Sequence, residues 1–286
     1  MSKNFKPKTQ VIIDQANEII REYLEQGMSL SLRQLYYRFV AGALLENKQT
    51  EYSRLGSIIN DARLAGLINW RAIEDRGRQL LAFRTFADPG QAVRSIVSTY
   101  QIDRWSDQVH RVEVWVEKQA LEAVVEGAAD EYQVPTFSCK GYNSQSEMWR
   151  AAMRFQRYQG KGQVPVIIHL GDHDPSGIDM TRDIIDRLET FGMPMEVNRI
   201  ALNMDQVEKY DPPPYPAKQT DSRCTGYFEK YGDDSWELDA LEPAVMKKLI
   251  QKTIKKYMDK SLYDARVDQE ESERSRLDDM ADNWKD

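Results

Sequence analysis

Residues 164–177 read Val-Pro-Val-Ile-Ile-His-Leu-Gly-Asp-His-Asp-Pro-Ser-Gly. The first seven residues are almost all apolar, which is typical of a strand buried on both faces of a parallel sheet. Two aspartates, Asp172 and Asp174, follow directly, and Pro175 and Gly177 favour a tight turn before the next helix. The stretch therefore predicts a buried strand that presents two carboxylates at its carboxyl end.

The chain on either side of this stretch alternates between strand and helix patterns. Valines alternate with Glu or Trp over residues 111–117, and strands are also predicted over 134–138 and 196–201. Helical periodicity is predicted over four further segments: 120–132, 145–158, 179–191 and 243–258. Strands and helices that alternate at this spacing favour βαβ units and therefore a parallel sheet in an α/β fold.

The first hundred residues have a helical pattern instead. Helices are predicted over Gln10–Glu25, Leu32–Ala43 (opened by Ser31) and Tyr52–Ala65, with Gly27 as a C-cap and a short extended segment over Leu67–Trp70. Three short helices followed by an extended segment are compatible with a winged-helix module. Residues 87–108 are expected to form a connector and one helix. The predicted division is residues 1–105 for the helical module, 106–265 for the α/β domain and 266–286 for an acidic tail.

The charged residues that give the net charge of −7 are unevenly distributed along the chain. Residues 1–110 hold 15 Lys+Arg and 12 Asp+Glu, a balance of +3, which leaves −10 for residues 111–286. The tail from Asp268 to Asp286 holds 8 acids and 3 bases, and we expect it to be a solvated or disordered end. Overall acidity therefore does not exclude DNA as a partner, although it predicts local, salt-sensitive binding.

The remaining composition excludes several classes of protein. No apolar run approaches the roughly 20 residues that a membrane span requires, and no secretory signal pattern occurs at residues 1–10. Only Cys139 and Cys224 are present, so neither a disulfide framework nor a zinc-ligand spacing is indicated. We expect a cytoplasmic protein that associates with the nucleoid and not with membranes.

Carboxylates follow two of the predicted strands. Glu117 ends the strand over residues 111–117, and Asp172 and Asp174 follow the strand over 164–170. Parallel strands present their carboxyl ends at one edge of the sheet, where converging carboxylates repel one another unless a cation lies between them. Hard oxygen ligands favour Mg²⁺. The alternative is that each acid is only a helix N-cap or a solvated loop residue.

These motifs resemble a known family. Glu-Lys after the first strand and Asp-x-Asp-Pro-x-Gly after the third look like the two signatures of a Toprim domain. Residues 139–142 (Cys-Lys-Gly-Tyr) resemble a turn of the topoisomerase VI A subunit and of the related meiotic double-strand-break protein, and residues 202–210 and 236–241 (Trp-Glu-Leu-Asp-Ala-Leu) match as well. The resemblance implies a Rossmann-like Toprim sheet. It also implies Mg²⁺, with Mn²⁺ as a substitute, on Glu117, Asp172 and Asp174 against a scissile DNA phosphate.

The resemblance extends to a tyrosine in the helical module. Residues 31–38 (Ser-Leu-Arg-Gln-Leu-Tyr-Tyr-Arg) are similar to the segment that holds the family's nucleophilic tyrosine, and the second tyrosine of the pair is Tyr37. Helix spacing puts Tyr36 in the apolar stripe and Tyr37 on the flank beside Arg33, where nearby cations would help the phenol to ionise. The alternative is that Tyr37 is a half-buried aromatic residue of the helical module, or one that only touches DNA, without a catalytic role. One departure from the family is Asn143-Ser144, where Pro-Asp is usual.

Several basic residues and both histidines of the α/β domain are further candidates. The expected DNA contacts are Arg33, Arg38, Arg63, Lys118 and Lys140, with Arg71, Arg76 and Arg78 as additional phosphate contacts of the helical module. Basic residues on a polar face are also commonly only solvated. His169 is expected to be a core histidine, whereas His173 has a position from which it could touch substrate.

The resemblance implies a Mg²⁺-dependent enzyme that cleaves double-stranded DNA as a homodimer, with Tyr37 meeting the acids of the partner subunit. The chain has no Walker motif, so an ATPase would have to be a separate partner. It looks most like short A-like proteins of bacterial mobile elements and phages. One alternative is a Toprim nuclease that hydrolyses DNA with metal-activated water. The other is a non-catalytic DNA-binding regulatory protein.

Overall fold

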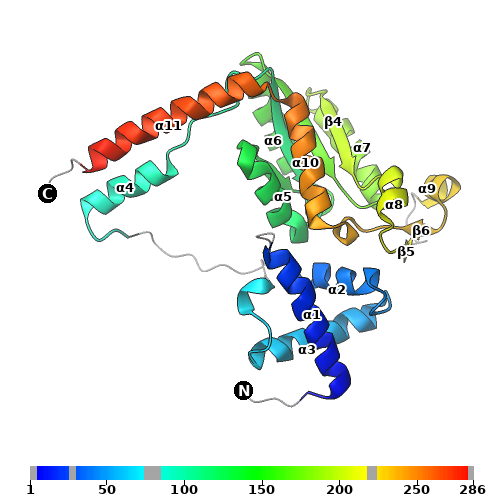
Figure 1. Cartoon of the computed structure of the whole chain (residues 1–286). Helices are drawn as coiled ribbons and strands as arrows, with labels where there is room; N and C mark the ends of the chain where they lie inside the picture. Colours follow the sequence, from blue (N-terminus) through cyan, green and yellow to red (C-terminus); the bar gives the residue numbers. More distant parts are fainter. Residues whose placement is uncertain (1–4, 26–29, 74–84, 218–223, 283–286) are drawn as a thin grey trace.

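The computed structural model describes residues 5–25, 30–73, 85–217 and 224–282. It consists of a helical unit, a parallel sheet with helices on both faces, and an arm of two helices (Figure 1). The α/β class and the parallel sheet predicted from the sequence are confirmed. Within these ranges, no helix combines the length and the apolar character that crossing a membrane requires.

The helical unit is built from α1 (Pro7–Glu25), α2 (Leu32–Ala41), α3 (Gln49–Leu64) and a 3-10 turn, η1 (Trp70–Ala72). It has its own apolar core, which includes Ile13, Leu35, Phe39 and Leu55. Helix α2 begins at a capping box, in which Ser31 Oγ accepts from the Gln34 amide at 3.1 Å and the Gln34 side chain accepts from the Ser31 amide at 2.8 Å. This box satisfies amides that a helix start otherwise leaves unpaired.

The segment after α3 differs from the prediction. Residues 67–70 are predicted to be extended, but they form a turn that leads into η1, and among the described residues the nearby β pairing consists of a bridge between Leu30 and Ile73. The turn closes because the Leu67 amide donates to the Ala62 carbonyl at 2.9 Å. The predicted C-cap Gly27 and the predicted phosphate contacts Arg76 and Arg78 lie outside the described residues.

The sheet has the strand order β2-β1-β3-β4, and all its pairings are parallel. Its strands are β1 (His110–Val116), β2 (Thr136–Ser138), β3 (Val164–Leu170) and β4 (Glu196–Ala201). Strand β2 lies on one side of β1, whereas β3 and β4 lie on the other. The chain therefore reverses its direction across the sheet between β1 and β3, and ligands of open α/β sheets bind at such a switch point.

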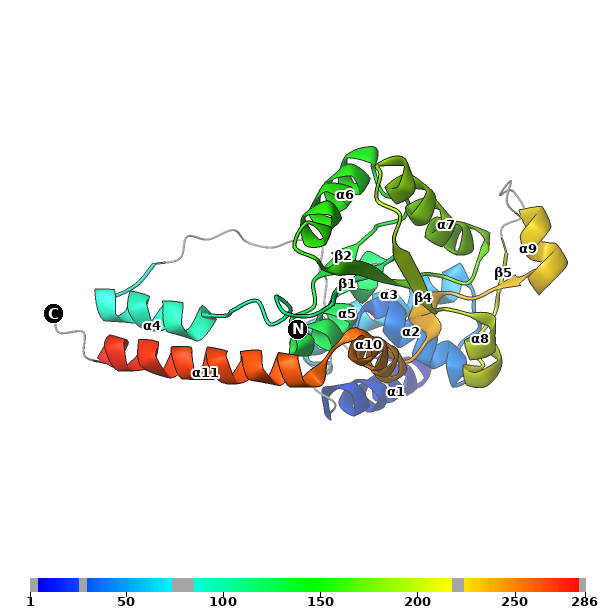
Figure 2. The same ribbon diagram turned by 90° about the horizontal axis from the view of Figure 1, so that it is seen from above.

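Helices cover both faces of the sheet (Figure 2). One face packs against α5 (Glu122–Ala129) and α10 (Pro243–Tyr257), and the other packs against α6 (Gln145–Gln159) and α7 (Pro175–Thr190). Two 3-10 turns flank α5: η2 (Gln119–Leu121) and η3 (Asp130–Tyr132). Alternate β1 residues point to opposite faces, so Val114 packs with α5 and Trp115 with α6.

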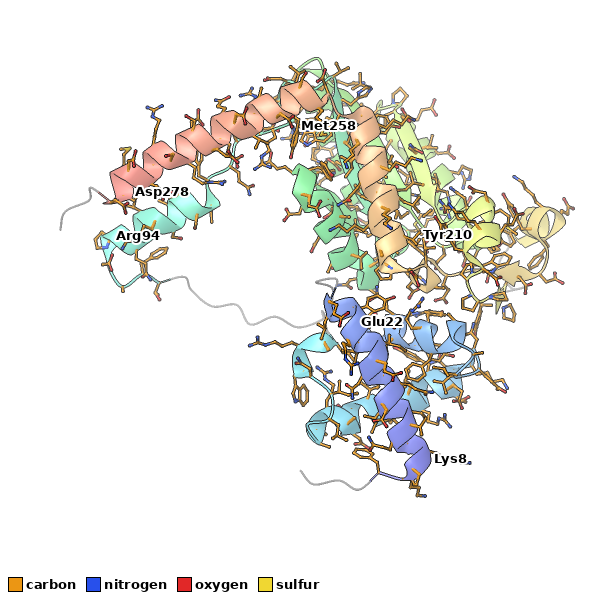
Figure 3. The ribbon with its side chains drawn as sticks, viewed as in Figure 1. Lys8, Glu22, Arg94, Tyr210, Met258 and Asp278 are labelled. Atoms are coloured by element: carbon orange, nitrogen blue, oxygen red, sulfur yellow. The ribbon has the colours of Figure 1, made fainter. Side chains whose placement is uncertain are left out.

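After β4 the chain runs through short elements that reach the helical unit. These are α8 (Met204–Tyr210), β5 (Tyr215–Pro216), α9 (Cys224–Tyr231), β6 (Asp234–Ser235) and the 3-10 turn η4 (Leu238–Ala240). Figure 3 labels Tyr210 at the end of α8. Ala240 of η4 packs against the core of the helical unit. Residues 236–242 therefore form the main connection between the two units.

The arm consists of α4 (Pro89–Thr99) and α11 (Lys260–Asp282), which lie side by side and extend away from the sheet (Figures 1 and 2). Figure 3 labels Arg94 on α4, Asp278 on α11, and Met258 where α10 gives way to α11. The acidic end was expected to be solvated or disordered: residues 268–282 are helical, so disorder is wrong for them, but most of their side chains are exposed to solvent. Glu270 explains why this end is helical: its buried carboxylate lies 2.7 Å from Arg104 and 2.8 Å from Arg274, so its charge is neutralised.

Candidate functional site

Glu117 and Asp172 meet at the switch point of the sheet. The Glu117 amide donates to the Leu170 carbonyl at 2.9 Å, which extends the pairing of β1 and β3 by one residue. The Asp172 amide then donates to Glu117 Oε2, also at 2.9 Å. Both side chains are largely withdrawn from water, and Asp172 is only 7% exposed. The structure therefore brings together two of the three acids predicted as a metal site.

Asp174 lies at the start of α7, where its side chain caps the helix. Its Oδ1 accepts from the Gly177 amide at 2.6 Å, so Asp174 is the N-cap of the helix. The cap explains why α7 begins at Pro175 and not at the predicted Asp179. The N-cap alternative therefore holds for Asp174, although its negative charge also acts on Glu117.

Two glycines let the backbone close around the Glu117 carboxylate. A Cβ on Gly177 would lie 2.3 Å from the Asp172 carbonyl oxygen, and a Cβ on Gly171 would lie 2.9 Å from Glu117 Oε2. A larger residue at position 177 would have to displace the loop backbone, and one at position 171 would have to displace the Glu117 and Arg199 side chains. The glycines of the Gly-Asp-His-Asp-Pro-Ser-Gly motif are thus explained by the close approach of loop and acid.

Arg199, which was not predicted as a site residue from the sequence, fixes the loop after β3. Its guanidinium donates to the carbonyls of Gly171 at 3.0 Å, Asp172 at 2.6 Å and Gly177 at 2.9 Å. These bonds hold the backbone that presents the acids. The available signal was an arginine near the end of the predicted strand over residues 196–201, beside the apolar pair Ile-Ala.

Lys118 lies at the centre of a cluster of charges. Its Nζ is 3.0 Å from Asp172, 2.8 Å from Asp239 and 3.1 Å from Glu237. The Leu238 amide donates to Asp172 Oδ1 at 2.7 Å, so the segment 236–241 is tied to the end of β3 at the same place. Lys118 was predicted to contact DNA. Glu237 and Asp239 were recognised only as part of a matching segment, without a role.

Tyr37 joins this cluster from the helical unit. Its hydroxyl donates to Glu237 Oε2 at 2.5 Å, and Arg33 pairs with the same carboxylate and with Asp239 at 3.0 Å. Tyr37 is 6% exposed, and Arg33 lies 5.9 Å from its ring. The predicted neighbours Tyr37 and Arg33 are thus found side by side. The acids that Tyr37 meets belong to its own chain.

The expected effect of a nearby cation on Tyr37 is present, since Arg33 lowers the pKa of the phenol, but burial and two acids outweigh it. Burial, and then the negative charges of Asp239 and Glu237, raise the pKa of Tyr37, and Arg33 opposes this only in part. For Glu237, burial alone would raise the pKa, but Lys118, the Tyr37 hydroxyl and Arg33 outweigh it and lower the pKa to about 2. Tyr37 is therefore held as a neutral phenol by an ionised carboxylate.

The acids have the chemistry of a site for a hard divalent cation. Burial raises the pKa of Asp172 to about 8, with Lys118 opposing, and burial also raises the pKa of Glu117. A bound cation would favour the ionised form of both acids, because it offsets the negative charge that burial disfavours. In the described ranges, however, no three His, Cys, Asp or Glu side chains are gathered as metal ligands, and Lys118 occupies the place beside Asp172.

The other predicted DNA contacts have different surroundings. Arg38 pairs with Glu242 at 2.7 Å, and Arg63 donates to the carbonyls of Trp70 at 2.9 Å and Ile73 at 3.1 Å, which closes the helical unit on itself. Arg71 is exposed on η1. Lys140 is exposed in a left-handed turn that lies beside Glu117, because the next amide, that of Gly141, donates to the Glu117 carbonyl at 3.3 Å.

Both histidines lie inside the protein. His169 is fully buried in β3 with Nδ1 2.9 Å from Thr181, and burial lowers its pKa to about 3. The prediction that His169 lies in the core is confirmed, but the expectation that its ring is fully hydrogen-bonded is not, because Nε2 has no partner among the described residues. His173 is 1% exposed, packs against Trp236 and lies 2.8 Å from the Tyr227 hydroxyl, so in this arrangement its ring is buried.

Replacing Lys118 by Met should destabilise the protein by about 3–5 kcal/mol, because buried carboxylates lose their cation. Urea unfolding in the presence of a chelator measures the effect, and excess Mg²⁺ should restore part of the loss. The matched control is Lys247→Met, which removes a surface pair with Glu131 and should cost at most about 1 kcal/mol. Equal stability of the two variants would contradict the central position given to Lys118.

Binding of Mg²⁺ should strengthen as the pH rises from 6 to 8. The raised pKa of Asp172, about 8, keeps its proton in place at neutral pH, and a cation must displace it. The affinity should rise about tenfold per pH unit below that pKa, with release of about one proton. Calorimetry in two buffers of different ionisation enthalpy measures both quantities. Asp172→Asn should abolish the proton release, and pH-independent binding would refute the prediction.

Comparison with known proteins gives no family for this chain. No protein-family model matches it, and no curated protein matches its sequence. Any function must therefore be inferred from the residues and contacts described above.

Proposed function

We propose that this protein cleaves DNA strands in the manner of a topoisomerase VI A subunit. The helical unit serves as a winged-helix module that supplies the nucleophile Tyr37, and the sheet serves as a Toprim domain that supplies Glu117, Asp172 and Asp174. The proposal covers cleavage alone, because strand passage would require a separate ATPase partner.

One observation supports this proposal most strongly. The Tyr37 hydroxyl lies 2.5 Å from Glu237, which lies 3.1 Å from Lys118, which lies 3.0 Å from Asp172. A continuous series of contacts therefore runs from the candidate nucleophile to the acids at the switch point. Tyr37 and the acids were selected from separate motifs, and a surface tyrosine unrelated to the acids would have no reason to lie there.

The reaction proposed for these residues is a transesterification. Tyr37 Oη attacks phosphorus, the P–O3′ bond breaks, and the protein is left joined to the DNA 5′ end. Glu237 accepts the phenol proton as the Oη–P bond forms, and this same proton passes on to the departing O3′, so that no further reactant is needed. Arg33 and Lys118 are the cations closest to Tyr37 and Glu237, and they can exchange carboxylate partners for phosphate oxygens.

Glu117, Asp172 and Asp174 are the residues that would hold Mg²⁺ or Mn²⁺. When bound, such a cation supplies Lewis-acid stabilisation of charge on the phosphate. Lys118 holds Asp172 in position in its absence, and Arg199 keeps the loop in the shape that presents both aspartates.

Tyr37→Phe should reduce plasmid cleavage by at least about a thousandfold, because the nucleophilic oxygen is lost. Supercoiled plasmid is incubated with protein and Mg²⁺ or Mn²⁺, quenched in detergent and analysed with and without protease digestion. Nicked or linear DNA should enter the gel only after protease treatment. Tyr158→Phe, on the outer helix α6, is the matched control and should retain full cleavage.

Two other outcomes assign the alternative functions. Cleavage that survives Tyr37→Phe, with products that need no protease, identifies a Toprim nuclease that uses metal-activated water. Absence of cleavage by the wild type with either metal, together with DNA binding that survives Glu117→Gln and Asp172→Asn, identifies a non-catalytic DNA-binding protein.

The within-chain contact predicts that each site uses its own tyrosine and its own acids. Tyr37→Phe and Glu117→Gln proteins, each inactive alone, should remain inactive when they are mixed and allowed to exchange subunits. A homodimer with sites shared between subunits would recover one complete site, and the mixture would nick plasmid. Nicking by the mixture would therefore show that Tyr37 leaves Glu237 to meet the acids of a partner.

A further inference from the structure

A cavity of about 260 Å³ lies beside the candidate nucleophile. Tyr37, Arg33 and Glu237 line it on the side of the charge cluster, and the aromatic residues Tyr36, Tyr52 and Tyr215 line it elsewhere. Its volume is just below the roughly 300–1,000 Å³ of sites for drug-sized molecules. The cavity therefore has room for one ring system and not for a folded segment.

The aromatic walls of the cavity come from both units and are held in place. The Tyr36 hydroxyl accepts from the Lys48 amide at 2.8 Å and lies 3.0 Å from the Glu46 carbonyl, and its ring meets Tyr52 edge-on with centroids 5.3 Å apart. Tyr215 comes from β5, and Asn47 donates to the neighbouring Pro214 carbonyl at 3.2 Å. Tyr52 is half-buried and Tyr215 is 37% exposed, so these rings can accept a partner.

The remaining lining is polar and includes positive charge. Asn47 and Gln49 carry amide groups that can pair with the edge of a base, and Lys48 and Arg33 carry positive charge. Aromatic faces combined with amides and cations are the features by which proteins hold an unstacked base next to its phosphate.

We propose that this cavity receives one unstacked nucleobase of the DNA, adjacent to the phosphate that Tyr37 attacks. This inference rests on the proposed function, since it names the part of the DNA that the same site recognises. The base would be drawn out of the duplex toward Tyr52 and Tyr215 while its phosphate lies at Arg33.

Fluorescence anisotropy of the full chain with three labelled duplexes tests the proposal. The first duplex is fully paired, the second carries one unpaired extra nucleotide, and the third carries the same extra backbone unit without a base. The duplex with the extra nucleotide should bind about tenfold more tightly than the paired one, because unstacking no longer has to be achieved by the protein. The abasic duplex should show none of this gain.

The variants Tyr52→Ala and Tyr215→Ala should each reduce the gain to less than about threefold, and Tyr52→Phe should preserve it. Tyr215→Ala removes an exposed ring, so it remains informative if Tyr52→Ala impairs folding. Tyr158→Ala on α6 is the control outside the cavity and should keep the full gain.

Each contrary result has its own meaning. If the duplex with the extra nucleotide and the abasic duplex bind equally well, the protein prefers a flexible backbone, and the base site is overturned. Equal binding of all three duplexes, with cleavage intact, would overturn the base site and leave the proposed function standing. Binding of dAMP alone as tight as that of the extra-nucleotide duplex would assign the cavity to a free nucleotide. Failure to bind any DNA would overturn both the proposed function and this inference.

Discussion

The ammonium group of Lys118, held among Asp172, Glu237 and Asp239, is the interaction on which the rest of the site depends. These three acids come from two distant parts of the chain, and the Lys118 ammonium group offsets the negative charge that develops where they approach one another. Lys118 can serve all three because it directly follows Glu117 at the end of β1, at the switch point of the sheet. The topology of the sheet therefore places the Lys118 ammonium group at the switch point. This positive charge allows the acidic segment 236–241 to pack against the end of β3.

The helical unit is attached to the sheet mainly through charged and polar contacts. Arg33 and Tyr37 bind Glu237, and Arg38 binds Glu242, so one face of α2 is matched to one short segment of the α/β unit. Ala240, which lies between Glu237 and Glu242 in the sequence, adds an apolar contact with the core of the helical unit. Because such ion pairs are exchangeable, a polyanion such as DNA can compete for the same arginines. The attachment would therefore loosen if the DNA of the proposed function reached these arginines.

Several acids of the chain are paired with internal cations. Glu270 neutralises Arg104 and Arg274 within the arm, and Glu237 and Asp239 neutralise Lys118 and Arg33 within the site. The net charge of −7 is consequently a poor guide to the charge that a ligand would meet. The same pairing explains why the acidic end is helical up to Asp282: its buried carboxylate is compensated by arginines that precede and follow it in sequence.

Local pattern determined the strands, most helices and the position of the acids. Periodicity and strand ends are encoded within about ten residues, so β3, β4 and the meeting of Glu117 with Asp172 could be predicted from the sequence. Only the tertiary structure decided that Tyr37 meets Glu237, 200 residues away, that Asp174 caps α7, and that Arg199 fixes the loop. It also reversed the expected ionisation of Tyr37, because burial and neighbouring charges set a pKa and both depend on how the two units pack.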